Sequence, residues 1–179
     1  MPERESHVDR KRKTMDYTRL GLPNYEELPD IPLYIDQVIQ YINSILQPVM
    51  GSGAGDALTR SMINNYVKAG LIPPPEGKLY TRSHVAYLLI VAAMKNVFSI
   101  PEIDQLFQIQ RSTYNEAVAY DYFVTELDNA LTLSFLEPGA SLPEHATKET
   151  AQTMLVRAMA LSFAGKAYVR AQLPEDEKH

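Results

Sequence analysis

Three consecutive prolines, Pro73 to Pro75, follow a short amphipathic segment and constrain the fold of this 179-residue chain more than any other feature. Proline fixes its own backbone φ angle and has no amide hydrogen, so this stretch must leave a preceding helix as a stiff extended segment. Gly70, just before it, is typical of a helix carboxyl terminus. The sequence therefore predicts a helix that stops at a rigid corner, and the corner fixes the direction of the residues that follow.

The helix before the corner is predicted to run from Arg60 to Ala69, with Thr59 as its amino-terminal cap. At helical spacing one face is apolar and packs, whereas the other carries Arg60, Ser61, Asn64, Asn65 and Lys68. That polar face has no carboxylate, although a solvated helix face usually mixes both charges. Asparagine can bond adenine edges in a major groove, and arginine or lysine can meet guanine or phosphate. An ordinary solvated face remains the alternative for these residues.

After the prolines, Glu76-Gly77 can turn the chain and Lys78-Leu79-Tyr80 can return as a short strand. Either Thr81 or Ser83 can then cap a helix over residues 84–97, whose apolar residues cover nearly its whole circumference and predict a central core helix. A helix, a tight β turn with a basic tip and a core helix form the layout of a winged helix-turn-helix. Its wing, residues 73–81, would place Lys78 and Arg82 against a phosphate backbone.

The remaining sequence is also helical in pattern. Ser99 to Glu102 match a capping box, and the helices expected outside the central region cover residues 33–46, ended by Pro48, and residues 99–107, 114–136 and 147–173. Glycine-rich residues 51–55 lack the Lys-Ser/Thr of a phosphate-binding loop and are predicted to be a flexible connector. The expected fold is mainly α: a mobile charged tail (1–20), a winged helix-turn-helix domain with a small β wing (21–110) and an all-helical carboxyl-terminal extension (111–179).

Composition narrows the class of protein. The chain has no cysteine, which removes disulfides and thiolate metal sites, and its four histidines are too scattered to predict a metal site. No nucleophile motif is present, so we expect no enzyme activity and no cofactor. The amino terminus has no apolar signal sequence, and the longest apolar run, residues 85–94, is too short to span a membrane. We expect a cytoplasmic protein with no membrane partner.

Charge is distributed unevenly along the chain. The formal net charge is -5, yet residues 56–99 hold five basic residues against two acidic ones. Residues 100–179 hold twelve acidic residues against six basic ones. The basic excess therefore coincides with the predicted helix and wing.

Three motifs of the central region resemble the DNA-binding domain of MerR-type regulators. They are Asn64-Asn65-Tyr66, Gly70-Leu71-Ile72-Pro73 and Lys78-Leu79-Tyr80-Thr81, and the likeness continues into Phe98 to Ile103. The segments 33–38, 62–68 and 80–84 are together similar to an uncharacterised bacterial family related to MerR. The resemblance implies a MerR-like winged helix-turn-helix in which Tyr66, Lys78 and Tyr80 belong to the DNA-binding surface, and a homodimer that reads a palindrome.

The sequence thus predicts a bacterial DNA-binding transcriptional regulator, with a recognition helix over 59–69 and double-stranded DNA as its partner. Seven aromatic residues of the carboxyl-terminal helices are expected to be core, and could also build a dimer seam or a pocket for an unknown small-molecule effector. The alternative is a protein-interaction module on a winged-helix scaffold that no longer binds DNA. The net charge and Asn64, which stands where MerR-type domains usually carry arginine, favour that alternative.

Overall fold

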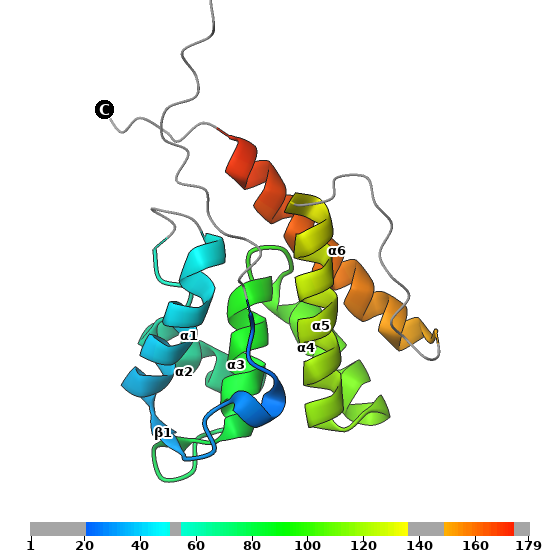
Figure 1. Cartoon of the computed structure of the whole chain (residues 1–179). Coiled ribbons are helices and arrows are strands. Elements are labelled where there is room, and N and C mark those ends of the chain that lie inside the picture. Colours follow the sequence, from blue (N-terminus) through cyan, green and yellow to red (C-terminus); the bar gives the residue numbers. More distant parts are fainter. Residues whose placement is uncertain (1–20, 51–54, 136–148, 174–179) are drawn as a thin grey trace, which may run out of the picture.

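A computed structural model describes residues 21–50, 55–135 and 149–173. The predicted mobile tail (1–20), most of the glycine-rich connector (51–54) and residues 136–148 and 174–179 lie outside the described residues. Within them the chain is mainly helical with a small two-stranded sheet, as the sequence predicts (Figure 1). The elements are the 3-10 helix η2 (Tyr25–Glu27), β1 (Leu33–Tyr34), α1 (Ile35–Met50), α2 (Arg60–Lys68), β2 (Leu79–Tyr80), α3 (Arg82–Met94), α4 (Ile100–Thr113), α5 (Glu116–Phe135) and α6 (Ala151–Gln172).

The first long helix differs from its predicted span at both ends. Leu33 and Tyr34 form β1 instead of helix, because they pair antiparallel with β2. At the other end α1 continues through Pro48 to Met50, so the predicted stop at Pro48 is wrong. Proline has no amide to donate to the carbonyl four residues earlier, so the last turn of α1 forms without that hydrogen bond.

Helix α3 lies at the centre of the molecule, between α1 with α2 on one side and α5 with α6 on the other (Figure 1). Ten of its thirteen residues are buried, which confirms the predicted core helix. It begins after Thr81, so Thr81 and not Ser83 is the cap. One hydrophobic cluster extends from Leu22, before η2, to Ala167 of α6.

The capping box predicted before α4 is confirmed. The Glu102 carboxylate accepts hydrogen bonds from the Ser99 amide and hydroxyl, both at 2.7 Å, and the Glu102 amide donates to the Ser99 hydroxyl at 3.4 Å. These hydrogen bonds from Ser99 hold the pKa of the Glu102 carboxyl below its usual range. The last two helices, predicted over 114–136 and 147–173, are α5 and α6.

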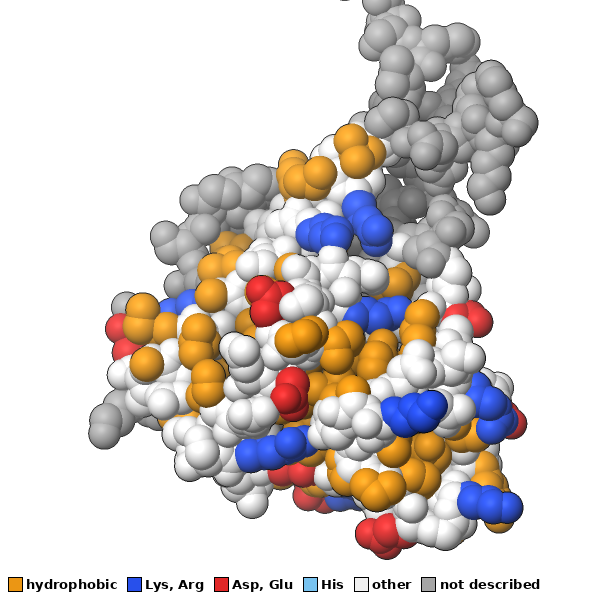
Figure 2. All heavy atoms as spheres, turned by 180° about the vertical axis from the view of Figure 1, so that it is seen from behind, with side chains coloured by type: hydrophobic (Ala, Val, Ile, Leu, Met, Phe, Trp, Pro, Cys, Tyr) orange, Lys and Arg blue, Asp and Glu red, His pale blue; other side chains and the backbone are white. Residues whose placement is uncertain are grey.

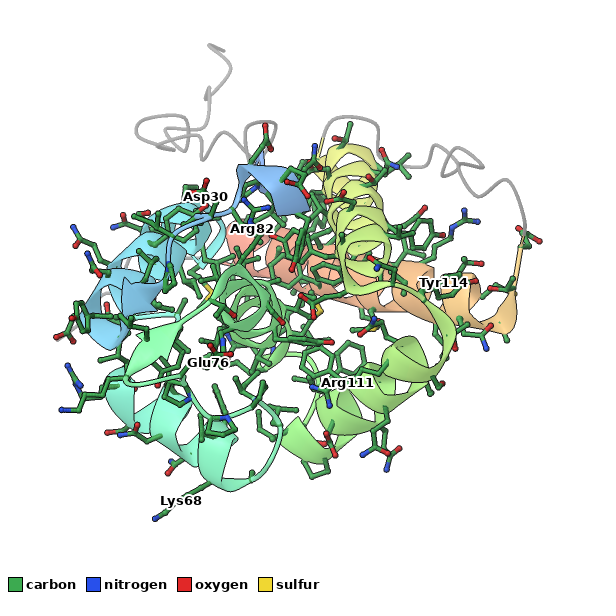
Figure 3. The ribbon with its side chains drawn as sticks, turned by 90° about the horizontal axis from the view of Figure 1, so that it is seen from below. Asp30, Lys68, Glu76, Arg82, Arg111 and Tyr114 are labelled. Atoms are coloured by element: carbon green, nitrogen blue, oxygen red, sulfur yellow. The ribbon has the colours of Figure 1, made fainter. Side chains whose placement is uncertain are left out.

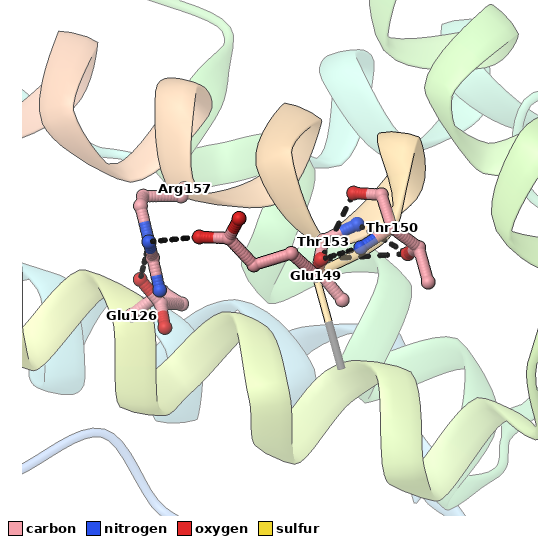
Figure 4. Close-up of polar contacts among 5 residues, drawn as sticks. All are labelled: Glu126, Glu149, Thr150, Thr153 and Arg157. Carbon is pink, nitrogen blue, oxygen red and sulfur yellow. Dashed lines mark hydrogen bonds and ion pairs between the residues drawn. The ribbon is translucent and has the colours of Figure 1, made fainter. Parts of the chain in front are cut away.

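Helices α5 and α6 pack along one another, and an ion pair lies within their interface (Figure 4). Glu126 is only 1% exposed, and its carboxylate accepts a 3.2 Å bond from Nε of Arg157. The guanidinium of Arg157 also lies 3.8 Å from the exposed carboxylate of Glu149. A carboxylate buried to this degree needs a paired cation, so the pair ties the two helices in one register.

The outer surface retains large apolar side chains. On the face opposite to that of Figure 1, hydrophobic side chains gather in patches among scattered charges (Figure 2). Several exposed hydrophobic residues belong to α5 and α6, namely Val118, Met154, Leu155, Leu161 and Val169.

Candidate nucleic-acid interface

Helix α2 begins at Arg60, as the sequence predicts, and ends at Lys68, one residue before the predicted end, because local signals fix both ends. The Thr59 hydroxyl accepts a 3.3 Å hydrogen bond from the Met62 amide, which satisfies one free donor of the first turn. Gly70 has a φ angle of 75°, a left-handed conformation that glycine adopts without strain. The backbone amides of Leu71 and Ile72 then return to the Tyr66 carbonyl. The helix is therefore closed before the first proline.

The two faces of α2 are separated as the sequence predicts. Ile63 and Tyr66 are buried in the core, and Met62 and Val67 are half-buried against it. The other face is exposed to solvent and carries Arg60, Ser61, Asn64, Asn65 and Lys68. Lys68 extends away from the protein at the outer edge of the helix (Figure 3).

The tertiary structure adds one acid to this otherwise acid-free face. Asp36, in the first turn of α1, lies 2.5 Å from the guanidinium of Arg60, and both side chains are more than half exposed. An exposed pair of this kind contributes about 0–1 kcal/mol, so Arg60 can leave it for a stronger anion. Lys68 and Lys78 have no ion pair within the described residues.

The segment after the prolines forms a tight turn followed by a short strand, as the sequence predicts. The Glu76 amide donates to the Leu79 carbonyl at 3.0 Å, and the Leu79 amide donates to the Glu76 carbonyl at 2.9 Å. Between them Gly77 and Lys78 both have positive φ angles, as in a type I′ hairpin. Lys78 is exposed and belongs to the turn, not to the strand predicted from residue 78. The following strand, β2, pairs with β1, since the prolines offer no amides for a longer hairpin.

The two tyrosines among the predicted site residues lie in the core. Tyr66 is 7% exposed and Tyr80 is 4% exposed, and burial raises the pKa of both phenols. The positive charge of the nearby Arg60 lowers the pKa of the Tyr80 phenol and so opposes part of the effect of burial. Because so little of either ring is exposed, both rings act as core residues that pack beneath α2 and the turn. A direct DNA contact by either tyrosine stays a prediction.

Arg82, the remaining predicted site residue, is engaged within the protein. Its guanidinium donates a 2.8 Å bond to Glu26 and lies 5.7 Å from the centre of the Tyr25 ring, and its side chain is only 22% exposed. Arg82 thus attaches η2 to the start of α3, and Figure 3 shows it beside η2. A phosphate contact by Arg82 would have to compete with Glu26.

His84 supports the turn from the start of α3. It is 4% exposed, and its Nδ1 accepts a 3.1 Å bond from the Thr81 amide. Its Nε2 lies 3.3 Å from the Pro74 carbonyl, so that nitrogen carries the proton and donates. The ring also packs edge-to-face on Tyr80. One histidine therefore fixes the proline corner to the core helix.

Two residues that the sequence did not single out position α2 from other helices. Asn43 of α1 holds the backbone of Leu58, donating to its carbonyl at 2.9 Å and accepting from its amide at 2.8 Å. Arg111 of α4 donates to the Leu71 carbonyl at 3.3 Å and stacks 4.8 Å from the centre of the Tyr87 ring. The position of Asn43 beside the apolar stripe of its helix was only a weak sign that its side chain faces the protein. Nothing in the sequence near Arg111 indicated a contact with Leu71.

Other kinds of site find no support in the described residues. No group of three or more His, Cys, Asp or Glu side chains in that part of the chain could hold a metal ion. None of the described helices combines the length and the apolar character that crossing a membrane would require.

The surface formed by α2 and the turn lies within a known sequence family. Residues 23–123 match a family described as a domain of unknown function, DUF1836. The chain belongs to this family. The match begins before η2, ends in α5 and includes α2 and the turn. The expected similarity to an uncharacterised family is therefore confirmed, and the match carries no link to MerR-type regulators. A search of curated proteins and a search of solved structures each found no match.

Proposed function

We propose that this protein is a bacterial DNA-binding transcriptional regulator with a MerR-like winged helix-turn-helix. Helix α2 enters the major groove, and the turn at residues 76–79 lies on the phosphate backbone. The observation that carries the proposal is the polar face of α2, whose five side chains are all exposed and uncovered by α5 or α6. Hydrogen-bonding amides with two basic residues suit base edges flanked by phosphates.

The exposed residues divide into two roles. Lys68 and Lys78 are exposed and free of carboxylate partners within the described residues, so they neutralise phosphates. Asn64 and Asn65 carry amides that match adenine in the major groove. Arg60 joins them by exchanging Asp36 for a phosphate or guanine.

The backbone at Lys78 supports its role. Its φ angle of 73° places a lysine in a left-handed position that glycine or asparagine would occupy at lower cost. Unfavourable backbone angles persist most often where the side chain is used. A lysine at the tip of a tight turn projects a positive charge away from the core.

The regulator acts as a homodimer, because a palindromic site needs two recognition helices about 34 Å apart, one turn of duplex DNA. The exposed apolar side chains of Met154, Leu161 and Val169 on α6 support association through packed helices. Sedimentation of the protein alone and with DNA measures the number of copies bound per site.

Salt dependence tests the proposal. Each phosphate contact contributes about -0.9 to the slope of log affinity against log salt, so three basic residues predict a slope of about -3 for one copy and about -5 for two. Fluorescence anisotropy with random duplex DNA measures this slope. Lys68→Ala and Lys78→Ala should each weaken binding to all sequences and make the slope shallower by about 1 per copy. Arg170→Ala, which removes an exposed basic residue of α6, is the matched control and should change neither quantity.

Sequence preference is tested separately. Asn65→Ala should leave binding to random DNA nearly unchanged and should broaden the set of sequences recovered by selection from a random pool. Binding that is absent at low salt, or insensitive to salt, would refute DNA recognition by this face.

The alternative, a protein-interaction module that does not bind DNA, has its own support. The formal net charge is -5, and Asp36 already occupies Arg60. Under this alternative the protein would not bind random duplex DNA even at low salt, so Lys68→Ala, Lys78→Ala and Asn65→Ala would have no binding to weaken.

A further inference from the structure

A cavity of about 390 Å³ lies among α3, α4, α5 and α6, on different elements from the exposed face of α2. Protein interiors pack with few voids larger than a water molecule. Sites for small molecules, in contrast, occupy about 300–1,000 Å³ and are lined mainly by apolar and aromatic side chains. The size of this cavity places it among such sites.

Aromatic rings make up much of the wall. Tyr87 from α3, Phe107 from α4, and Tyr122 and Phe123 from α5 line the cavity, and aliphatic side chains of α6 complete it. Tyr87 and Phe107 pack edge-to-face, with ring centres 4.8 Å apart. The wall therefore offers aromatic surface for stacking and edge contacts.

Two contacts hold the cavity in shape at the junction of α4 and α6. The Tyr114 hydroxyl lies 3.2 Å from the Thr150 hydroxyl at the start of α6, and the Gln110 amide donates to the Tyr114 carbonyl at 3.1 Å. Figure 3 shows Tyr114 at the end of α4, close to the start of α6. The space is thus bounded by hydrogen-bonded elements rather than by loosely packed side chains.

The charged groups in the cavity wall limit the charge that a bound ligand can carry. No lysine, arginine or histidine is among the described residues that line the cavity, so nothing there pairs with an anion. The carboxylate in the wall, Glu116, already accepts bonds from the Tyr25 and Ser83 hydroxyls at 2.7 and 2.8 Å. Burial, with the bond to Glu116, raises the pKa of Tyr25 to about 12, so this phenol keeps its proton and the carboxylate keeps its partner.

Several polar groups in the wall are occupied, whereas the buried hydroxyl of Tyr120, a lining residue, has no hydrogen-bond partner among the described residues. Gln110 bonds both Tyr87 and Tyr114 through its side chain, and Thr150 and Thr153 bond each other. Gln152 lines the cavity without a hydrogen bond to any described residue. Its amide is available to donate to, and accept from, one polar group of a ligand.

We propose that this cavity binds a neutral, mainly apolar small molecule containing an aromatic ring, with its polar group at Gln152. The absence of a cation from the described wall disfavours carboxylates and phosphates, because a buried anion needs a paired charge. A volume of about 390 Å³ suits a small molecule better than a helix of a partner protein. The site is independent of DNA binding, and either can exist without the other.

Two fluorescent probes that differ by a single charged group test the chemistry. N-phenyl-1-naphthylamine is neutral and aromatic, and 8-anilinonaphthalene-1-sulfonate is the same framework with a sulfonate. Titrated into the full chain, the neutral probe should bind saturably with one site per chain, and the sulfonate should bind at least about tenfold more weakly. Equal affinities for the two probes, or no saturable binding of the neutral one, would overturn the proposal.

Variants locate the probe. Ala119→Leu fills part of the cavity and should weaken binding of the neutral probe about tenfold or more. Ala171→Leu makes the same change at an exposed position of α6 that does not line the cavity, and it should leave the affinity unchanged. Leu155→Glu, at a lining position 41% exposed and therefore tolerant of change, should also weaken binding if Ala119→Leu fails to fold.

The protein concentration decides between a small molecule and a second copy of the chain. Probe affinity should be the same in dilute and concentrated protein. A loss of probe binding that follows self-association, or equal effects of Ala119→Leu and Ala171→Leu, would show that another occupant covers the cavity or that the probe binds elsewhere.

Discussion

The contact between Asn43 and Leu58 is a sharp test of how α2 is positioned. Asn43 is half-buried on α1, and its side-chain amide makes two hydrogen bonds to the backbone of Leu58, just before the cap of α2. Leu58 itself is fully buried. Replacing Asn43 by alanine removes both bonds and leaves one backbone donor and one acceptor without their partner.

The expected loss follows from these bonds. Each contributes about 1 kcal/mol to stability, and the two backbone groups that lose their partner together add a further penalty of about 1 kcal/mol, because water reaches them in part. Alanine recovers about 0.6 kcal/mol through its higher helix propensity. The net destabilisation of Asn43→Ala should therefore be about 2 kcal/mol. Asn43→Asp keeps the acceptor for the Leu58 amide and loses the donor, so its loss should be smaller.

Urea unfolding followed by circular dichroism at 222 nm measures this effect. With an m-value of about 2 kcal/mol/M, Asn43→Ala should lower the midpoint by about 1 M. Asn64→Ala is the matched control, because Asn64 is an exposed asparagine of α2, and it should raise stability by about 0.6 kcal/mol through the same gain in helix propensity. Equal midpoints for the two alanine variants would refute the reasoning that Asn43 holds the start of α2.

Three further predictions concern buried polar groups. His84→Ala loses the bonds to the Pro74 carbonyl and the Thr81 amide, and should cost about 3 kcal/mol in the same urea assay; a loss below about 1 kcal/mol would contradict its role at the corner. Arg157→Met leaves the Glu126 carboxylate buried and unpaired, and should cost about 3–5 kcal/mol, whereas a loss under about 1 kcal/mol would show that the carboxylate finds solvent. Burial raises the pKa of Asp128 above its unfolded value, so its charge destabilises the fold above that pKa. Asp128→Asn should accordingly raise the thermal midpoint at pH 7, by an amount that shrinks as the pH approaches about 4, and an equal gain at both pH values would contradict this cause.

Much of the secondary structure around the site could be predicted because its signals are local. Thr59 and Gly70 fix the ends of α2, and Ser99 with Glu102 fixes the start of α4, through hydrogen bonds that span three or four residues. The start of α1 could not be predicted in this way. Leu33 and Tyr34 are apolar residues compatible with a helix, and they became a strand because β2 lies opposite them.

The candidate site was predictable only in part. Helical spacing separates the polar face of α2 from its packing face, and the exposed residues agree with that division. Family resemblance brought Tyr66 and Tyr80 into the predicted site, although both side chains lie in the core. A motif gives the identity of a residue and its place in the sequence, but not the fraction of its surface that remains exposed.

The sequence by itself determined the elements of this protein: a capped helix with one polar face, a proline corner, a basic turn and a central apolar helix. Local hydrogen bonds and backbone restrictions specify these features, and they act over a few residues. Only the tertiary structure decided which charges remain free, because Asp36 and Glu26 reach Arg60 and Arg82 from segments 24 and 56 residues away in the sequence. It also decided where four helices line a cavity, since that space depends on how distant surfaces pack together.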